Sequence, residues 1–255
     1  MLDSPFKKKL FLGILIASSC LSLTVYSVYR ALTFQRREYY EVINQSEEYQ
    51  LKNGHEFERK VLELQNNARL SEDWAAEFTL DEINGWLATQ YLKRNENKKM
   101  LGQEIKRPRL LAYREGLQLY TQYHGSVGAD LMINFQVSMT DEPNQLALSI
   151  TGVYAGMWPL SMEKVTAEIT RICQEMKLPL KWNKEGEHPV ALITLPTEYQ
   201  ALPGRKIWLN VIELHESEEK LVLVNVYKEG KETQEEHSQK EYKIVLQGTT
   251  SLINE

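Results

Sequence analysis

Residues 131–150 read LMINFQVSMTDEPNQLALSI, and this stretch decides the fold. From 131 to 139 an apolar side chain at every second position alternates with mostly polar ones, the period of a β-strand with one buried face. The polar segment at 141–144, DEPN, is a turn, after which the alternation resumes as far as Ile150. Two long strands joined by so short a turn must run antiparallel. We therefore expect a meander with one face buried and the other in water.

The residues on either side of this stretch extend the sheet. Upstream, residues 110–113 and 117–121 are strand-like, and the Arg-Glu-Gly segment between them at 114–116 is typical of a hairpin turn. A short strand is also predicted at 74–78, WAAEF. Further strands are expected at 180–182, 190–195, 207–214 and 221–226.

Two helices are predicted to pack on this sheet. Thr79 is a suitable N-cap and Glu82 follows three residues later, a capping box that starts a helix running to about Leu92. Ser161 is the expected N-cap of a second helix, which Pro179 ends. In both helices, apolar side chains recur every three or four residues along one face. This order indicates the α+β class: an N-terminal transmembrane helix, then a curved antiparallel meander packed against two or three helices.

A polar segment at 32–70 precedes the sheet and is predicted to be a helical stalk, with Gly54 interpreted as a break. The apolar residues of one helical face in it are Phe57, Val61, Leu64 and Ala68. The segment after residue 227 is very polar, and we expect it to be disordered apart from one last strand at 242–246. The predicted division is a cytoplasmic tail at 1–9, an anchor at 10–31, the stalk at 32–70, an α+β domain at 71–227 and a polar tail at 228–255.

The run at 10–29, LFLGILIASSCLSLTVYSVY, is uncharged. At a rise of about 1.5 Å per residue it reaches about 30 Å as a helix, the thickness of the hydrocarbon core of a bilayer. We interpret it as a retained transmembrane anchor. A cleaved signal peptide has a shorter apolar core, and in a lipoprotein signal the residues after Cys20 should be polar; both remain alternatives.

The charges that flank the anchor are balanced. The basic residues are Lys7, Lys8 and Lys9 before it and Arg30, Arg36 and Arg37 after it. The positive-inside rule therefore does not fix the orientation by itself, but a tail of about nine residues is easily kept in the cytoplasm. We expect a single-pass protein of the cytoplasmic membrane, with these six residues at the membrane interfaces and the C-terminal domain outside.

Composition argues against several classes of function. The chain holds 30 basic and 35 acidic residues, and the first 37 residues hold six of the basic ones and one of the acidic ones, so the remainder has a net charge of −10. Such a surface repels phosphate backbones, and nucleic-acid binding is not expected. Of the two cysteines, Cys20 lies inside the apolar run and Cys173 lies far along the chain, so they are not expected to form a disulfide. The five histidines are scattered, so neither a metal site nor a cofactor is expected.

The order of elements, with FTLDEINGWLATQYL at 78–92 and YAGMWPLSMEKV at 154–165, resembles the YpmS-type anchored domains of bacterial envelopes. Those domains are similar in layout to one half of the tubular lipid-binding (TULIP) domains. The resemblance spans 10–195 and implies a curved antiparallel sheet that wraps a long helix and leaves an apolar groove. It brings no catalytic residues with it.

The candidate ligand-binding residues are Trp86, Trp158 and Trp182, which would line such a groove for acyl chains. The alternative is that they are ordinary core aromatics, because tryptophan buries much area in any domain of this size. The remaining candidates have simpler interpretations. The acidic residues Asp81, Glu82 and Glu163 fall in the first turns of helices, where the helix dipole favours them.

Three further motifs in the sequence are candidates for a functional or a structural role. The Gly-Ser-Val-Gly segment at 125–128 resembles a nucleophile turn but lacks its spacing, which favours a flexible loop. The basic cluster at 106–109, KRPR, is a candidate headgroup contact or a solvated loop. Asn84, inside a predicted helix, is expected to hydrogen-bond a neighbouring strand.

Three classes of function follow. The first is a non-enzymatic, membrane-anchored envelope protein that binds a lipid or another apolar ligand in a groove between helix and sheet. The second is an anchored scaffold with a solid core that docks other envelope proteins through an exposed apolar patch. The third is an envelope hydrolase, which would require Ser, His and Asp side chains from distant segments to converge, for example around His124 or His188.

Overall fold

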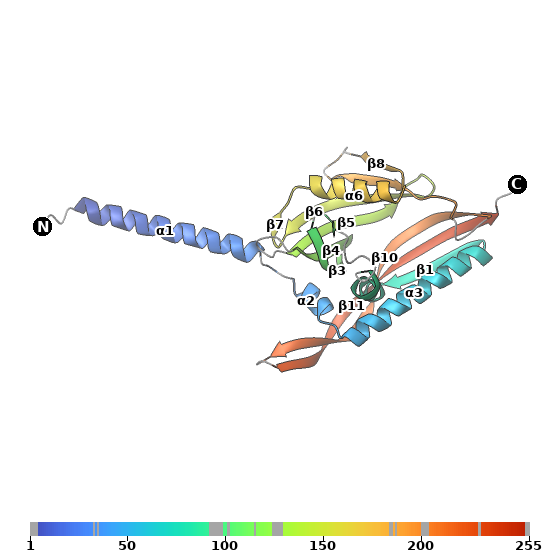
Figure 1. The fold of residues 1–255 in the computed structure, drawn as a ribbon, viewed down its shortest axis with the longest axis horizontal. Helices are drawn as coiled ribbons and strands as arrows, with labels where there is room; N and C mark the ends of the chain where they lie inside the picture. The colour runs from blue at the N-terminus through green and yellow to red at the C-terminus, as the bar shows by residue number, and fades with distance from the viewer. Residues whose placement is uncertain are drawn as a thin grey trace.

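The computed structural model describes residues 5–32, 34, 36–91, 99–100, 103–114, 116–123, 130–183, 186, 188–199, 204–228 and 231–252, with the backbone alone at 5–17, 20, 91, 99–100, 103–105, 123, 217–228 and 231–240. The chain is an α+β protein with antiparallel sheets, as the alternation at 131–150 predicts (Figure 1).

The helices are α1 (Pro5–Leu32), α2 (Arg37–Ile43), α3 (Glu47–Leu70), α4 (Leu80–Trp86), the π-helix η1 (Leu87–Tyr91) and α6 (Glu163–Glu175). The strands are β1 (Asp73–Thr79), β2 (Lys99–Met100), β3 (Gln103–Tyr113), β4 (Gly116–Tyr123), β5 (Asp130–Met139), β6 (Gln145–Ala155), β7 (Trp158–Pro159), β8 (Leu180–Asn183), β9 (Val190–Thr194), β10 (Arg205–Lys228) and β11 (Lys231–Leu252). An eight-stranded sheet has the order β2-β3-β4-β5-β6-β9-β8 with β7 also paired to β6, and a three-stranded sheet has the order β1-β11-β10.

The meander β3-β4-β5-β6 is confirmed, but its predicted wet face is wrong along the first half of β5. Residues 130–134 are all buried, and burial alternates only from residue 135 onwards. Met132 packs in one cluster with Tyr39 of α2, whereas Ile133 packs in another with Val165 of α6. The sheet is therefore covered on both faces there. The local alternation does not reveal this second buried face, because the helix that covers it, α2, lies far earlier in the chain.

The segment at 32–70 is not a stalk that stands apart from the domain. Tyr39 of α2 is fully buried and its ring stacks on that of Tyr120 in β4, with 4.3 Å between the ring centres. The Tyr39 hydroxyl donates to the backbone carbonyl of Arg107 at 3.0 Å. The following helix, α3, packs along α4 and β1. Both helices therefore belong to the domain, whose N-terminal boundary lies well before residue 71.

Gly54 does not break α3, which runs unbroken from Glu47 to Leu70. It is buried where α3 crosses α4, opposite Gly85. A Cβ atom added to Gly85 would lie 2.6 Å from both the Gln50 carbonyl oxygen and the Gly54 nitrogen. The two glycines therefore allow the helix backbones to touch, a packing role that a helix-breaking interpretation misses.

The polar segment after residue 227 was expected to be disordered apart from a strand at 242–246. The strand is confirmed, but it is part of β11, which runs from 231 to 252, so the expected disorder is wrong there. β11 is the central strand of the three-stranded sheet, paired with β1 on one side and along its whole length with β10 on the other. Residues 207–214 and 221–226, predicted as two strands, lie in β10 alone. A long hairpin satisfies the backbone of each strand through its partner, so a polar composition does not prevent strand formation here.

The predicted helix starts are confirmed in one case and shifted in the other. The Thr79 hydroxyl accepts from the Glu82 amide at 3.1 Å and the Glu82 carboxylate accepts from the Thr79 amide at 2.9 Å, the complete capping box. α6 begins at Glu163, with Met162 rather than Ser161 at the N-cap position. The Ser161 hydroxyl still accepts from the Glu163 amide, at 3.3 Å.

The helix α1 projects from the body of the molecule (Figure 1). Its last turn contacts the corner between β6 and β7, where the Met157 amide donates to the carbonyl oxygen of Ala31 at 2.7 Å. Among the residues whose side chains the structure describes, no helix combines the length and the apolar character needed to span a membrane.

Candidate functional site

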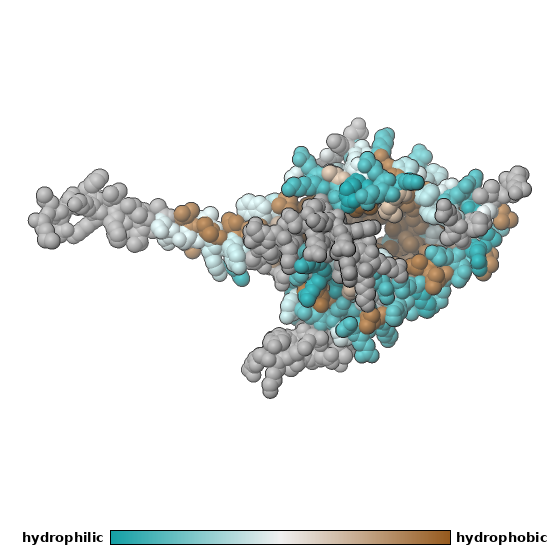
Figure 2. Space-filling model, viewed as in Figure 1, coloured by the Kyte–Doolittle hydropathy of each residue, from teal (hydrophilic) through white to brown (hydrophobic). Residues whose placement is uncertain are grey.

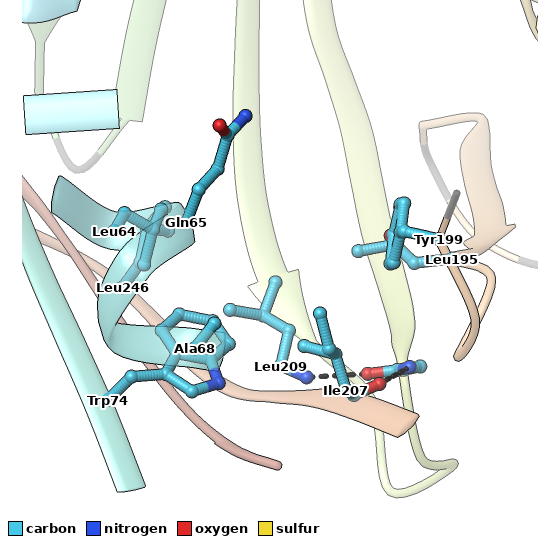
Figure 3. A pocket seen from close by; sticks show the side chains of 10 residues that line it. Leu64, Gln65, Ala68, Trp74, Leu195, Tyr199, Ile207, Leu209 and Leu246 are labelled. Carbon is cyan, nitrogen blue, oxygen red and sulfur yellow. Dashed lines mark hydrogen bonds between the residues drawn. The ribbon is translucent and has the colours of Figure 1, made fainter. Parts of the chain in front are cut away.

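An apolar pocket of about 290 Å³ lies between the three-stranded sheet, α3, the β5–β6 turn and the segment that follows β9 (Figure 3). In the space-filling view a brown recess opens between the two sheets (Figure 2). The lining residues are Leu64, Gln65 and Ala68 of α3, Trp74 of β1, Asn144, Leu195 and Tyr199 from the eight-stranded side, Ile207 and Leu209 of β10, and Leu246 of β11. Concave, mostly apolar and with few polar groups, it has the character of a small-molecule site.

Trp74 forms one wall of this pocket. It pairs with Gly248 of β11, and a Cβ atom at Gly248 would collide with the Trp74 ring, so the indole covers the glycine backbone. Trp74 is only 9 % exposed. Its Nε1 is buried and has no hydrogen-bond partner among the described residues. Figure 3 shows this nitrogen on the edge of the ring toward Leu209 and Ile207, across the pocket. A buried N–H without an acceptor is costly, but a ligand acceptor would reach this atom only if the side chains around it moved, because the structure leaves the nitrogen almost no accessible surface.

Asn144 fixes the opposite wall. It lies in the β5–β6 turn with φ +55°, a left-handed conformation that asparagine tolerates. Its side-chain amide donates to the carbonyl of Ile207 at 2.7 Å, and its Oδ1 accepts from the amide of Leu209 at 2.5 Å. The side chain thus occupies the place of a neighbouring strand beside β10. These two hydrogen bonds connect the eight-stranded sheet to β10 at the pocket, and they occupy both the amide nitrogen and the amide oxygen of Asn144.

The rim of the pocket is polar but uncharged. Gln65 is exposed on α3, and Tyr199 is partly exposed after β9. Burial raises the pKa of the Tyr199 hydroxyl above its ordinary value, so this group is neutral at physiological pH. None of the lining side chains that the structure describes carries a charge. The pocket therefore suits a neutral, largely apolar molecule.

The structure does not bring the three predicted tryptophans together in this pocket. Trp86 packs beside Phe57, with ring centres 5.4 Å apart. Trp182 packs on the α6 cluster and donates from Nε1 to the Thr170 hydroxyl at 2.9 Å. These two contacts favour the interpretation as core aromatics. Trp158 is 49 % exposed on β7.

The pocket lies against α3 and not against α6, whose Val165 and Ile169 pack on the sheet. The sequence did indicate the helical face that contains Leu64 and Ala68 and the strand that contains Trp74. Local patterns did not show that β10 and β11 complete the pocket, because these strands lie more than 130 residues further along the chain.

The residues predicted at the membrane interfaces fall into three groups. The side chains of Lys7, Lys8 and Lys9 lie outside the described residues. Arg30 is exposed on the last turn of α1. The Arg36 guanidinium lies 4.5 Å from the centre of the Tyr113 ring, and Arg37 forms an ion pair with Glu41 at 2.7 Å.

The acidic candidates of α4 have structural partners. Asp81 accepts from the hydroxyl of Tyr49 at 2.7 Å. Besides its capping role, Glu82 forms an ion pair with Lys60 at 2.7 Å. Both carboxylates are nearly buried. Glu163 lies in the first turn of α6, as predicted.

The basic cluster at 106–109 is not a solvated loop but part of β3, at a bulge opposite β4. Arg109 is 3 % exposed, and its guanidinium donates to the Pro108 carbonyl at 2.8 Å and to the Gln50 side chain at 3.2 Å. Burial lowers the pKa of Arg109 to about 10. Beside it, Asn84 pairs with both backbone groups of Leu110 at 2.7 and 2.8 Å, which confirms the predicted bond to a strand.

The described residues do not assemble a metal centre. No group of three or more His, Cys, Asp or Glu side chains within them is placed to hold a metal ion. The Nδ1 atom of His188 is buried and has no hydrogen-bond partner among the described residues. His124 and the Gly-Ser-Val-Gly segment at 125–128 lie outside the described residues.

Comparison of the chain with protein-family models, with curated proteins and with solved structures finds no match. The resemblance to YpmS-type domains stays a prediction.

Proposed function

We propose that this chain is a non-enzymatic, membrane-anchored protein that binds an apolar ligand in the pocket between α3 and β10. The observation that carries the proposal is a mostly apolar pocket with Trp74 in its wall, whose Nε1–H is buried and has no partner among the described residues. An apolar wall alone would accept any hydrophobic occupant, whereas this donor selects one that presents an acceptor.

The lining defines the chemistry of the ligand. A volume of about 290 Å³ is at the small end for ligand pockets, enough for one short chain or part of a longer one. Among the described residues no cation lines the pocket to balance a carboxylate or phosphate, and such a group would be expensive to bury unpaired. A neutral acceptor such as an ester carbonyl beside Trp74 fits better. The ligand class is therefore an acyl ester.

The anchor is the second part of the proposal. The uncharged run at 10–29 has the length of a membrane span. Where side chains of α1 are described, Leu21, Leu23 and Val25 are each more than 60 % exposed, an arrangement that water does not favour and lipid does. The protein is proposed to cross the cytoplasmic membrane once, with its N-terminus inside.

The cavity also bears on the rival function. An anchored scaffold that docks other envelope proteins needs only a solid core and a surface patch. A recess lined by apolar side chains contributes nothing to that role and weakens the packing. This favours ligand binding over scaffolding.

Quenching of Trp74 tests the proposal. Fragment 33–255, which lacks α1, is titrated in detergent-free buffer with the methyl ester of dibromostearic acid, whose bromines quench nearby indoles. We expect saturable quenching that Trp74→Phe removes and Trp182→Phe, a matched control in the α6 cluster, retains. The free acid should bind more weakly than the ester. Quenching that does not saturate, or that persists unchanged in Trp74→Phe, would contradict the proposal.

A further inference from the structure

The corner between β6 and β7 is bonded to the end of α1. The Met157 amide donates to the carbonyl oxygen of Ala31 at 2.7 Å. Gly156 has φ +57°, and a Cβ atom there would collide with the carbonyl oxygens of Ala31 and Leu32. The Gly156 amide donates to the carbonyl of Asp130 in β5 at 2.8 Å. The last turn of α1 is therefore joined directly to the eight-stranded sheet.

Large apolar side chains at this corner face solvent. Met157, Trp158 and Leu160 are between 42 and 59 % exposed. Tyr26 and Tyr29, on the last turns of α1, are exposed to a similar degree. Apolar side chains are therefore exposed both on the last turns of α1 and at the corner that α1 contacts through Ala31. Exposed apolar patches usually mark a contact with a partner or a membrane.

The bond to Ala31 fixes the depth of the corner in a bilayer. If the run at 10–29 fills the hydrocarbon core, Ala31 lies two residues, about 3 Å, beyond its edge. The headgroup layer on each side of the core is roughly 5–8 Å thick. Met157, held at the level of Ala31, would therefore lie inside that layer. Tryptophan and tyrosine are enriched there, and exposed Arg30 would meet the phosphates.

We propose that residues 156–160 form a membrane-contact corner, which inserts Met157, Trp158 and Leu160 into the headgroup layer of the bilayer that α1 crosses. This inference rests on the proposed anchor. It assigns Trp158 to the lipid surface instead of a ligand groove. The backbone of Gly156 packs directly against the carbonyl groups of Ala31 and Leu32. The contact between the corner and the bilayer therefore sets how the domain and its pocket are oriented relative to the membrane.

Spin-label accessibility in phosphatidylcholine vesicles tests the corner with the full chain. The background is Cys20→Ser; Cys173 is buried, and burial raises the pKa of its thiol, so it reacts poorly. Labels are placed by Met157→Cys at the corner, by Leu21→Cys in α1 and by Lys181→Cys on the exposed surface of β8. For each site, collisions with oxygen, which concentrates in lipid, are compared with collisions with a water-soluble nickel chelate.

We expect the oxygen-to-nickel ratio at Met157→Cys to exceed that at Lys181→Cys several-fold and to lie below that at Leu21→Cys, because the headgroup layer is intermediate between water and the hydrocarbon core. A lipid-like ratio at Leu21→Cys with a water-like ratio at Met157→Cys would overturn the inference and leave the anchor standing. A water-like ratio at Leu21→Cys would overturn both. Low accessibility of Met157→Cys to both reagents would also overturn it, because a protein contact would then cover the corner.

Discussion

The indole ring of Trp74 lies over the backbone of Gly248 on the paired strand β11, in the space that any larger residue at 248 would need. This contact holds the ring at the pocket wall. It keeps Nε1 buried and without a partner among the described residues. The geometry of one cross-strand pair therefore positions the indole N–H, a buried polar group that a simple gap in the packing would not have.

Trp74→Phe should weaken binding of an acyl ester without unfolding the protein. Phenylalanine keeps an aromatic ring over Gly248 but has no N–H. One hydrogen bond contributes about 0.5–1.5 kcal/mol, so affinity should fall about 2- to 10-fold. Isothermal titration of fragment 33–255 measures it, with methyl laurate as the ligand and dodecane as the matched ligand that has no acceptor. Equal losses for both ligands would show that the variant perturbs the wall and not the hydrogen bond.

Asn144 should be needed to hold β10 against the eight-stranded sheet. Asn144→Gly tolerates φ +55° but leaves the backbone groups of Ile207 and Leu209 without their partner, which should lower the free energy of unfolding by about 1–3 kcal/mol. Asn144→Ala should lose about 1 kcal/mol more, because alanine is strained in this conformation. Urea unfolding followed by fluorescence gives both values. If alanine proved more stable than glycine at this position, the assigned backbone conformation would be wrong.

Gly85→Ala should separate α3 from α4. The added methyl would lie 2.6 Å from the backbone of α3, so the helices must shift, and overpacking of this kind costs about 1–3 kcal/mol. The better helix propensity of alanine offsets about 1 kcal/mol of that loss. Asn66→Ala, on an exposed position of α3, is the matched control and should be neutral or slightly stabilising. Thermal unfolding that ranked Gly85→Ala above the unchanged chain would rule out the close helix contact.

Stability should fall at alkaline pH through Tyr120. Burial raises the pKa of its hydroxyl to about 12 in the folded state, against about 10 when unfolded. Between these values the folded chain holds a proton that the unfolded chain has lost, so the free energy of unfolding falls as pH rises. Below about pH 10 the contribution is complete.

The comparison with Tyr120→Phe isolates this effect from nearby groups. The raised pKa of Tyr39 acts in the same direction, and the lowered pKa of Arg109 acts in the opposite one. From pH 8 to 11 the unchanged chain should lose about 1 kcal/mol more than Tyr120→Phe. Parallel pH profiles for the two proteins would mean that Tyr120 titrates as an exposed tyrosine.

The parts of the fold that follow from local periodicity could be predicted from the sequence. The strand pair at 131–150 and the Thr79–Glu82 capping box depend on neighbours within a few residues, and both are present as expected, whereas the burial of both faces at 130–134 depends on a distant helix. The burial of Tyr39 against Tyr120 and the pairing of β11 with β1 join segments about 80 and 170 residues apart. Nothing in either segment alone specifies the other, which is why a stalk and a tail were predicted instead.

The site was predictable only in part, for the same reason. Leu64, Ala68 and Trp74 were recognised as residues of a helix face and a strand, but their partners Ile207 and Leu246 come from the hairpin that the polar composition concealed. The tryptophans chosen by residue type lie elsewhere. Residue type indicates that a side chain prefers burial, and only tertiary contacts decide whether it fills a core or borders a cavity.

The contents of the pocket test the central proposal most directly. Fragment 33–255 is purified without detergent and extracted with chloroform and methanol, and the extract is analysed by mass spectrometry. The control is Ala68→Trp, which fills the cavity from α3. We predict an acyl ester near one molecule per chain from the unchanged fragment and little from the variant. No acyl compound from the unchanged fragment, or equal amounts from both proteins, would contradict the assignment of this pocket as a ligand site.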